Sequence, residues 1–207
     1  MAKLYFRYSA MNSGKSTNLL QVAHNYEERG MRVLIAKPGV DTKDGSKVSS
    51  RLGLSREVDY IINEDDNLYG VFALDAYFGI SDCHDSDGEI LTISCIIIDE
   101  SQFLTRDHVN QLFEFASQKN IPVICYGLRT DFRGQGFPGA TRLLELAHSI
   151  EELKTICRCG KKATMNGRVI NGEFVKDGSQ VAIDNDNCTY ESLCGKCYLS
   201  KVQQPLA

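Results

Sequence analysis

A short stretch ending in Gly-Lys-Ser limits the folds open to this chain more than any other feature of its sequence. The aromatic-rich residues 3–8 before it predict a strand, and apolar side chains at helical spacing after it predict a helix over residues 16–29. Residues 32–36 (RVLIA) predict a second strand, ended by Pro38 and Gly39. Strand, loop, helix and strand in this order form a βαβ unit, which implies a parallel sheet with a right-handed crossover.

The loop between the first strand and the helix has the composition of a phosphate-binding loop. Backbone N–H groups in such a loop point at phosphate oxygens, and the helix dipole favours the anion. Lys15 would neutralise β- and γ-phosphate charge, and the Ser16 hydroxyl would ligate Mg²⁺. The general pattern has glycine where this chain has Ser9. A turn that ends in Gly-Lys-Ser by chance is the alternative, and the flanking strand and helix disfavour it. The predicted nucleotide-binding residues are Ser9, Ala10, Met11, Asn12, Ser13, Gly14, Lys15 and Ser16.

Two acids, Asp99 and Glu100, follow an apolar, β-branched run at residues 93–98 that is typical of a buried parallel strand. Ligands of open α/β sheets bind at the carboxyl ends of the strands. Asp99 is therefore expected to support Mg²⁺, and Glu100 to accept a proton from an attacking hydroxyl or water. A solvated strand end is the alternative. The phosphate loop in the same sheet favours phosphoryl transfer or NTP hydrolysis instead.

Two cysteine pairs near the C-terminal end predict a zinc site. Cys157 and Cys159 form the first pair, and Cys194 and Cys197 form the second. Four thiolates can close a tetrahedral zinc site with no open position, which indicates a structural role. The chain after Cys157 has no long apolar run, so a metal would supply the stability that a thin core cannot. Four free thiols are the alternative.

The remaining pattern completes an α/β fold: a P-loop NTPase-type parallel sheet flanked by helices over residues 1–154, and a small zinc-binding lobe with a substrate-closing loop over residues 155–207. Cys95 and Cys125 lie in strand-like apolar runs and are expected in the core. The further predicted elements are helices at 68–78, 106–119 and 141–148, a buried strand at 121–128 and a strand at 153–156 that closes the sheet. The apolar side of the helix at 106–119 is predicted to carry Val109, Leu112, Phe113 and Ala116.

Two polar segments are predicted to be surface loops. Residues 42–56 contain two glycines and five serines or threonines, which favours a mobile loop over a core element. Residues 81–89 are acidic and rich in turn formers, which favours an exposed loop.

The charge of the chain disfavours several partners. The net charge is −4 and no block of like charges occurs, so nucleic acid is a poor default partner. The first ten residues have no long apolar segment with a cleavage site, and no apolar run is long enough to span a bilayer. We therefore expect a cytoplasmic protein with no membrane partner.

With these features in place, the chain resembles the type II thymidine kinases, most of all the bacterial members, over nearly its whole length. The family commonly lacks glycine at the position of Ser9, and its bacterial members include the CxC form of the first cysteine pair. Two departures are the absence of the family's Gly-Gly from residues 181–190 and Lys43 in place of a common arginine. The matching segments are YSAMNSGKST (8–17), DESQF (99–103), YGLRTDFRG (126–134), TICRCGKKAT (155–164) and YESLCGKC (190–197).

The resemblance implies ATP-dependent phosphorylation of the 5′-hydroxyl of thymidine or deoxyuridine, with Glu100 as general base. The phosphate loop would hold ATP and Mg²⁺ together with Asp99, Glu100, Ser101 and Gln102. Leu128 and Phe132 would border the base pocket, and Tyr190 would pack in the loop that closes over the nucleoside. The resemblance also implies a homotetramer inhibited by thymidine triphosphate. The implied ligands of the structural zinc are Cys157, Cys159, Cys194 and Cys197.

Two other hypotheses share these features. A nucleic-acid-associated P-loop ATPase would have the same loop, acid pair and zinc lobe, but the negative charge and the lack of interleaved basic and aromatic residues disfavour it. An inactive nucleotide-binding paralogue is disfavoured by the complete set of Lys15, Asp99 and Glu100.

Overall fold

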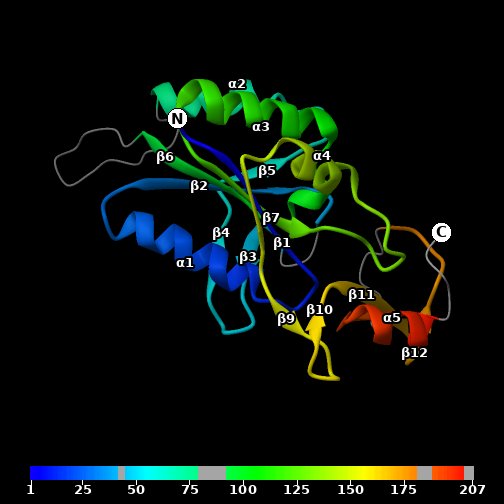
Figure 1. Ribbon diagram of the computed structural model, residues 1–207. Coiled ribbons are helices and arrows are strands. Elements are labelled where there is room, and N and C mark those ends of the chain that lie inside the picture. Colours follow the sequence, from blue (N-terminus) through cyan, green and yellow to red (C-terminus); the bar gives the residue numbers. More distant parts are fainter. Residues whose placement is uncertain (42–44, 79–91, 181–187, 203–207) are drawn as a thin grey trace.

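A six-stranded parallel sheet forms the centre of the computed structural model, which describes residues 1–41, 45–78, 92–180 and 188–202. The strand order is β5-β2-β6-β7-β1-β8, and each neighbouring pair is parallel. The predicted parallel α/β fold is confirmed (Figure 1). The predicted loop at 81–89 and residues 181–187 lie outside the described residues. The strands are β1 (Leu4–Ser9), β2 (Arg32–Pro38), β5 (Tyr60–Ile62), β6 (Ile93–Ile98), β7 (Val123–Leu128) and β8 (Ser149–Glu152).

Helices cover both faces of this sheet, so its central strands are buried on both sides. One face carries α1 (Lys15–Glu27), and the other carries α2 (Leu68–Phe78), α3 (Arg106–Lys119) and α4 (Pro138–Leu146) (Figure 1). The α1 face buries Cys95 with Leu19 and Ile97, and the α3 face buries Cys125, so both cysteines are core residues as predicted. Each large apolar side chain buried here contributes about 1.5–3 kcal/mol to the free energy of folding.

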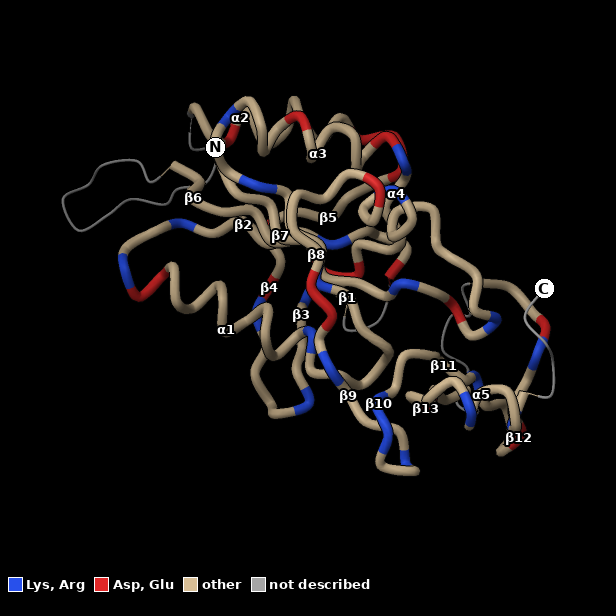
Figure 2. The backbone as a smooth tube through the Cα atoms, in the orientation of Figure 1, with Lys and Arg blue, Asp and Glu red and all other residues tan. Residues whose placement is uncertain are grey.

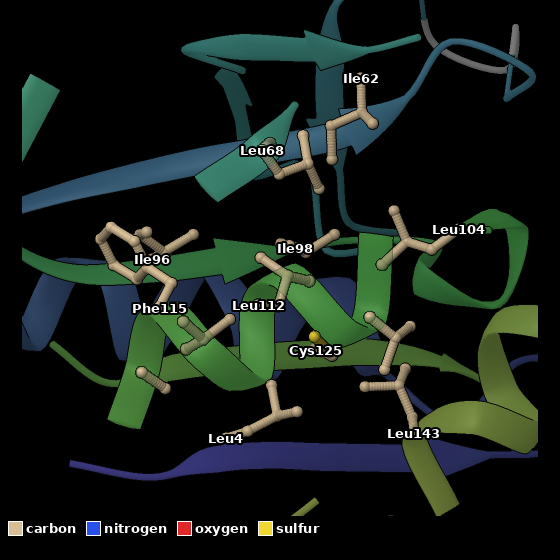
Figure 3. Packing of buried hydrophobic residues seen from close by; sticks show 14 of the residues in the cluster. Leu4, Ile62, Leu68, Ile96, Ile98, Leu104, Leu112, Phe115, Cys125 and Leu143 are labelled. Carbon is tan, nitrogen blue, oxygen red and sulfur yellow. The ribbon is translucent and has the colours of Figure 1, made fainter. Parts of the chain in front are cut away.

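The helix α3 has the predicted bounds because both of its ends carry clear signals. The Thr105 hydroxyl accepts a hydrogen bond from the His108 N–H at 3.1 Å, and Asn120 ends the helix in a left-handed conformation with φ 58°. Figure 3 shows Leu112 and Phe115 packed between this helix and the sheet. The predicted apolar side is confirmed: Phe113 packs half-buried against the same cluster, stacked on His148, and Phe115, which was not predicted, is fully buried beside it.

The segment predicted as a mobile loop at 42–56 instead contains most of a hairpin. Strands β3 (Lys47–Ser49) and β4 (Ser55–Glu57) pair antiparallel, and Val48 is buried against the α1 face of the sheet. Ser50 and Gly53 lie in its turn, where Gly53 has φ 83° and its N–H donates to the Ser50 carbonyl at 3.0 Å, whereas Ser49 and Ser55 pair in the strands. Composition alone could not separate a turn from a loop.

The predicted closing strand at 153–156 was also wrong. The sheet ends instead with β8, whose sequence Ser-Ile-Glu-Glu is unusually polar for a parallel strand. Polar residues suit this position because an edge strand has one free side and charges discourage pairing with other chains. Strand β9 (Thr155–Ile156) turns away from the sheet and pairs with β10 (Lys162–Ala163).

The C-terminal lobe is built from short strands and one helix. Strand β11 (Met165–Ile170) lies between β12 (Glu173–Val175) and β13 (Cys188–Leu193), and α5 (Gly195–Val202) follows. No helix in the part of the chain that the structure describes is long and apolar enough to cross a membrane.

Candidate active site

The phosphate loop connects β1 to α1 through two residues in left-handed conformations. Gly14 has φ 81° directly before the first helical residue, Lys15, and Asn12 has φ 61°. The hydroxyls of Ser9 and Ser13 hydrogen-bond to each other across the loop. This contact closes the loop in the absence of the consensus glycine at position 9.

A cavity of about 340 Å³ opens over this loop. Loop residues 11–17 line it, and so does Glu100, which follows β6. Lys15 is 8% exposed, so its ammonium is largely sheltered by the protein. Ser9, Ala10 and Asp99 are buried behind the lining. The structure therefore brings Lys15 and Glu100, two residues 85 positions apart in the sequence (100 − 15), to one cavity.

The acid pair sits at the point where β6 ends. Glu100 adopts a left-handed conformation with φ 48° and ψ 37°, and its N–H donates to Asp99 Oδ1 at 3.0 Å. Burial and the neighbouring Glu100 charge raise the pKa of Asp99 to about 7, and Lys15 acts in the opposite direction. A left-handed non-glycine residue costs roughly 1–2 kcal/mol, and such strain is common at functional sites. Here it turns the Glu100 side chain into the cavity.

A 3₁₀ turn, η1 (Ser101–Phe103), holds Glu100 in place. The Gln102 amide donates to Glu100 Oε2 at 2.5 Å and accepts the Leu128 N–H at 3.0 Å. The Ser101 hydroxyl donates to the Tyr126 carbonyl at 2.9 Å. Both residues are fully buried: Ser101 contacts β7, and Gln102 contacts both Glu100 and β7.

A second cavity of about 370 Å³ lies next to η1. Its lining includes the aromatic rings of Phe103 and Phe137, which meet edge to face at 5.6 Å, and the side chain of Gln180 from the lobe. Gln102 also lines it. Since Gln102 hydrogen-bonds to Glu100, this residue links the second cavity to the first.

The structure brings Phe132 and Tyr190 together through Arg168 of β11. The Arg168 guanidinium lies 3.8 Å from the centre of the Phe132 ring, and its Nε donates to the Tyr190 hydroxyl at 2.9 Å. Its two terminal nitrogens donate to the carbonyls of Ser179 and Gln180 at 2.8 and 3.1 Å. Arg168 is 3% exposed, so the charge is buried and satisfied by neutral groups. Burial raises the pKa of Tyr190, and Arg168 opposes this shift.

Asn166, two residues earlier on β11, docks the lobe onto the phosphate loop. Its side-chain carbonyl accepts the Met11 N–H at 2.8 Å, and its amide donates to the Thr130 carbonyl at 2.9 Å. The Asn12 amide also donates to the Tyr190 carbonyl at 3.3 Å. The lobe therefore contacts the nucleotide loop directly.

The four predicted zinc ligands form one cluster. The sulfurs of Cys157, Cys159, Cys194 and Cys197 all lie within 4.8 Å of one another. Hydrogen bonds from the backbone N–H groups of Cys159 and Cys194 lower the pKa of Cys157 to about 6, whereas the neighbouring thiols raise the pKa of Cys197 to about 12. Four such sulfurs cannot all ionise without a compensating cation, and a soft tetrahedral donor set of this kind fits Zn²⁺.

Comparison with known proteins identifies the family of this chain. The model of the thymidine kinase family matches residues 2–198. The chain belongs to the thymidine kinase family. The thymidine kinase of Legionella pneumophila (strain Lens) is 48% identical over 94% of this chain and 88% of that protein. Thymidine kinases of Francisella tularensis (strain SCHU S4) and Chromobacterium violaceum are 43% and 44% identical, over 95–96% of this chain and 96% and 98% of those proteins.

Solved structures offer a weaker likeness to this member of the thymidine kinase family. Bacteroides Pif1 bound to ssDNA aligns with a TM-score of 0.40 and 14% identity over 75% of this chain and 39% of that chain. A likeness of this size carries no argument about function.

The sequence analysis missed several residues of this thymidine kinase family site. Asn166 and Arg168 could have been suspected, because they are two positions apart and would share one face of any strand formed there. A polar pair on one face of a small lobe needs buried partners. Phe103 and Phe137 line the second cavity, and the hairpin tip lines the first. No comparable local pattern in the sequence indicated these positions.

Proposed function

We propose that this protein transfers the terminal phosphate of ATP to the 5′-hydroxyl of thymidine, and also of deoxyuridine, as a step of nucleotide salvage. The observation that carries the proposal is the shared cavity of Lys15 and Glu100. Phosphoryl transfer needs a cationic cradle for the donor and a carboxylate that faces the acceptor. Membership of the thymidine kinase family supports the choice of donor and acceptor.

In this proposal the backbone N–H groups of the loop and Lys15 bind the ATP phosphates. Glu100 takes the proton of the 5′-hydroxyl as that oxygen bonds to the γ-phosphorus and the bond to the ADP oxygen breaks. The Ser16 hydroxyl and the Asp99 carboxylate fit Mg²⁺, since oxygen ligands suit this ion and the buried Asp99 carboxylate lies beside a second acid, Glu100. Bound Mg²⁺ would neutralise charge on the β- and γ-phosphates.

The nucleoside is proposed to enter from the side of the second cavity. Gln102 would orient Glu100 through their 2.5 Å hydrogen bond, and Ser101 would fix the turn that carries it. Leu128 and Phe132 would border the base, with Tyr190 in the loop that closes over it. Arg168 supports this arrangement because it ties Phe132, Tyr190 and the carbonyls of residues 179 and 180 into one unit.

The finer points of the proposal rest mainly on the family. We assign a structural Zn²⁺ to the four cysteines, a division into a kinase domain (1–154) and a zinc lobe (155–207), a cytoplasmic homotetramer and inhibition by thymidine triphosphate. Nucleic acid is not among the proposed partners. Figure 2 agrees with this for the sheet domain, where Lys and Arg are interspersed with Asp and Glu.

Radiolabelled ATP and each of the four deoxynucleosides provide the test. Wild type should label thymidine and release ADP in equal amounts. Glu100→Gln should lower kcat by about 100-fold or more, the usual contribution of a general base, while its affinity for ATP changes little. Glu114→Gln, an exposed change on α3, serves as the matched control.

Two results would contradict the proposal. Turnover of Glu100→Gln close to that of wild type would remove the base assignment. ATP hydrolysis that DNA stimulates and thymidine does not would favour the nucleic-acid-associated ATPase.

A further inference from the structure

The tip of the β3–β4 hairpin lines the cavity over the phosphate loop. Ser49, Ser50 and Arg51 contribute to its wall together with Lys15 and Glu100. The hairpin is anchored at some distance from the tip, by Val48 in the core and by an ion pair between Arg56 and Glu27 of α1. Its tip is therefore held over the loop by contacts that do not depend on a ligand.

Arg51 is the cationic group of this tip. Its guanidinium donates a hydrogen bond to the side-chain carbonyl of Asn12, at the left-handed turn of the phosphate loop. The side chain is exposed to the cavity, and within the described residues no carboxylate lies at ion-pair distance from it. Other arginines of the described structure do have such partners, for example Arg7 with Glu151 and Arg56 with Glu27. Arg51 thus presents a charge that is not matched by an acid in the described structure.

Ser50 provides a second, independent observation. Its hydroxyl oxygen is buried and has no hydrogen-bond partner in the described structure, although Ser50 lines the cavity. A buried hydroxyl without a partner is costly, and such groups commonly await a ligand or an ion. Lys15 and the phosphate loop line the same cavity, so an anion bound there would lie next to Ser50 and offer its hydroxyl an acceptor.

We propose that Arg51 contacts the terminal phosphate of the bound nucleoside triphosphate, with the Ser50 hydroxyl donating to the same group. A planar guanidinium matches phosphate oxygens with two parallel hydrogen bonds. Charge on those oxygens changes as the phosphoryl group moves, so a second cation in the cavity of Lys15 stabilises the transition state. The inference rests on the proposed function, and it adds a catalytic residue outside the phosphate loop and the acid pair.

Arg51→Ala tests the contact through binding as well as turnover. The affinity for the β,γ-imido analogue of ATP, measured by calorimetry, should fall about tenfold, because one charge-assisted contact contributes roughly 1.5–3 kcal/mol. The affinity for ADP, which lacks the terminal phosphate, should stay within about twofold of wild type. The value of kcat for thymidine should fall at least about 100-fold, toward the range known for arginines on a transferring phosphoryl group. Arg51→Lys keeps the charge without the fork and should recover part of kcat.

Lys47→Ala is the matched control, since it removes a positive charge from the same hairpin at an exposed pair with Glu57. It should leave both affinities and kcat unchanged. Equal loss of ADP and analogue affinity in Arg51→Ala, or no loss of either, would overturn the inference. A wild-type protein that binds nucleotide but does not phosphorylate thymidine would refute the proposed function alone. In that case a selective loss of the triphosphate in Arg51→Ala would still support the contact.

Discussion

The sheet domain and the C-terminal lobe are stabilised in different ways. The sheet domain buries two apolar clusters, one on each face, and its central strands contain almost only apolar side chains. The lobe has one small cluster, formed by Ala163, Leu193, Tyr198 and Val202 around two of the cysteines. A core of that size cannot offset the entropy lost when the lobe is ordered. The lobe therefore depends on the cysteine site and on its docking to the sheet.

The two regions also carry different parts of the candidate active site. The rigid domain carries the phosphate loop and Glu100, which must keep a fixed geometry for phosphoryl transfer. The lobe carries Asn166, Arg168 and Tyr190, which reach across to the loop and to Phe132. Elements that close over a ligand are usually drawn from the less stable parts of a protein. This difference predicts that substitutions in the lobe weaken nucleoside binding more than they weaken ATP binding.

Removal of the proposed Zn²⁺ is expected to have the largest effect. Zinc binding contributes roughly 10–16 kcal/mol in zinc-finger peptides, so a zinc chelator or Cys194→Ser should unfold the lobe and abolish thymidine phosphorylation. Hydrogen exchange of the β11 and β13 amides should accelerate by orders of magnitude, on the order of 100-fold or more, whereas the amides of β6 and β7 should keep their protection. Cys188→Ser, a cysteine of the lobe outside the cluster, is the control and should exchange like wild type. Equal acceleration in both regions would show that the two are one cooperative unit.

Loss of the hydrogen bonds of the Arg168 guanidinium should have the second-largest effect. Lysine can keep the charge but not all three hydrogen bonds, and a hydrogen bond to a charged group contributes about 1.5–3 kcal/mol. Arg168→Lys should raise the KM for thymidine roughly 100-fold, an amount equal to about 3 kcal/mol, with little change in the KM for ATP.

The control for this change is Arg158→Lys. Arg158 belongs to the same lobe, and its side chain is 82% exposed. Arg158→Lys should leave the KM values for thymidine and for ATP unchanged. A parallel rise of both KM values in Arg168→Lys would mean that Arg168 supports the whole lobe and has no selective role at the nucleoside site.

The sequence predicted the rigid half of the molecule better than the lobe. The bounds of β6 could be predicted from its continuous apolar, β-branched run, and those of α3 from its apolar periodicity, which agrees with the Thr105 cap and the Asn120 stop. The proximity of Lys15 and Glu100 also followed, since parallel strands bring their carboxyl ends to one edge. Local pattern and global fold give the same answer in these segments.

Features that depend on distant contacts were not predictable in the same way. The hairpin tip at Ser50 and Arg51 reads as a polar loop, and only its packing on α1 places it over the phosphate loop. The edge strand β8 is polar because it has only one neighbour, β1, which a sequence window does not show. The role of Arg168 requires the rings of Phe132 and Tyr190, which are 36 residues before it and 22 after it.

The smallest effect is expected inside the rigid domain, where packing and not metal holds the site. Gly139 of α4 lies against η1: a Cβ there would be 2.6 Å from the Leu104 carbonyl oxygen and 2.7 Å from that of Ser101. Backbone atoms cannot swing aside as a side chain can, so Gly139→Ala should push η1 and cost about 1–3 kcal/mol of stability, the usual range for overpacking. Thermal unfolding should report that loss.

The same change should also lower kcat, because η1 carries Gln102 and so sets the position of the Glu100 carboxylate. Gly70→Ala on α2 is the matched control, since its Cβ would meet only the Asn67 side chain, at 3.2 Å, and alanine favours a helix over glycine by about 1 kcal/mol. That variant should be as stable as wild type or more so, with normal kcat. If Gly139→Ala lost stability but kept kcat, η1 would tolerate displacement, and the geometry of Glu100 would have to be fixed by β6 alone.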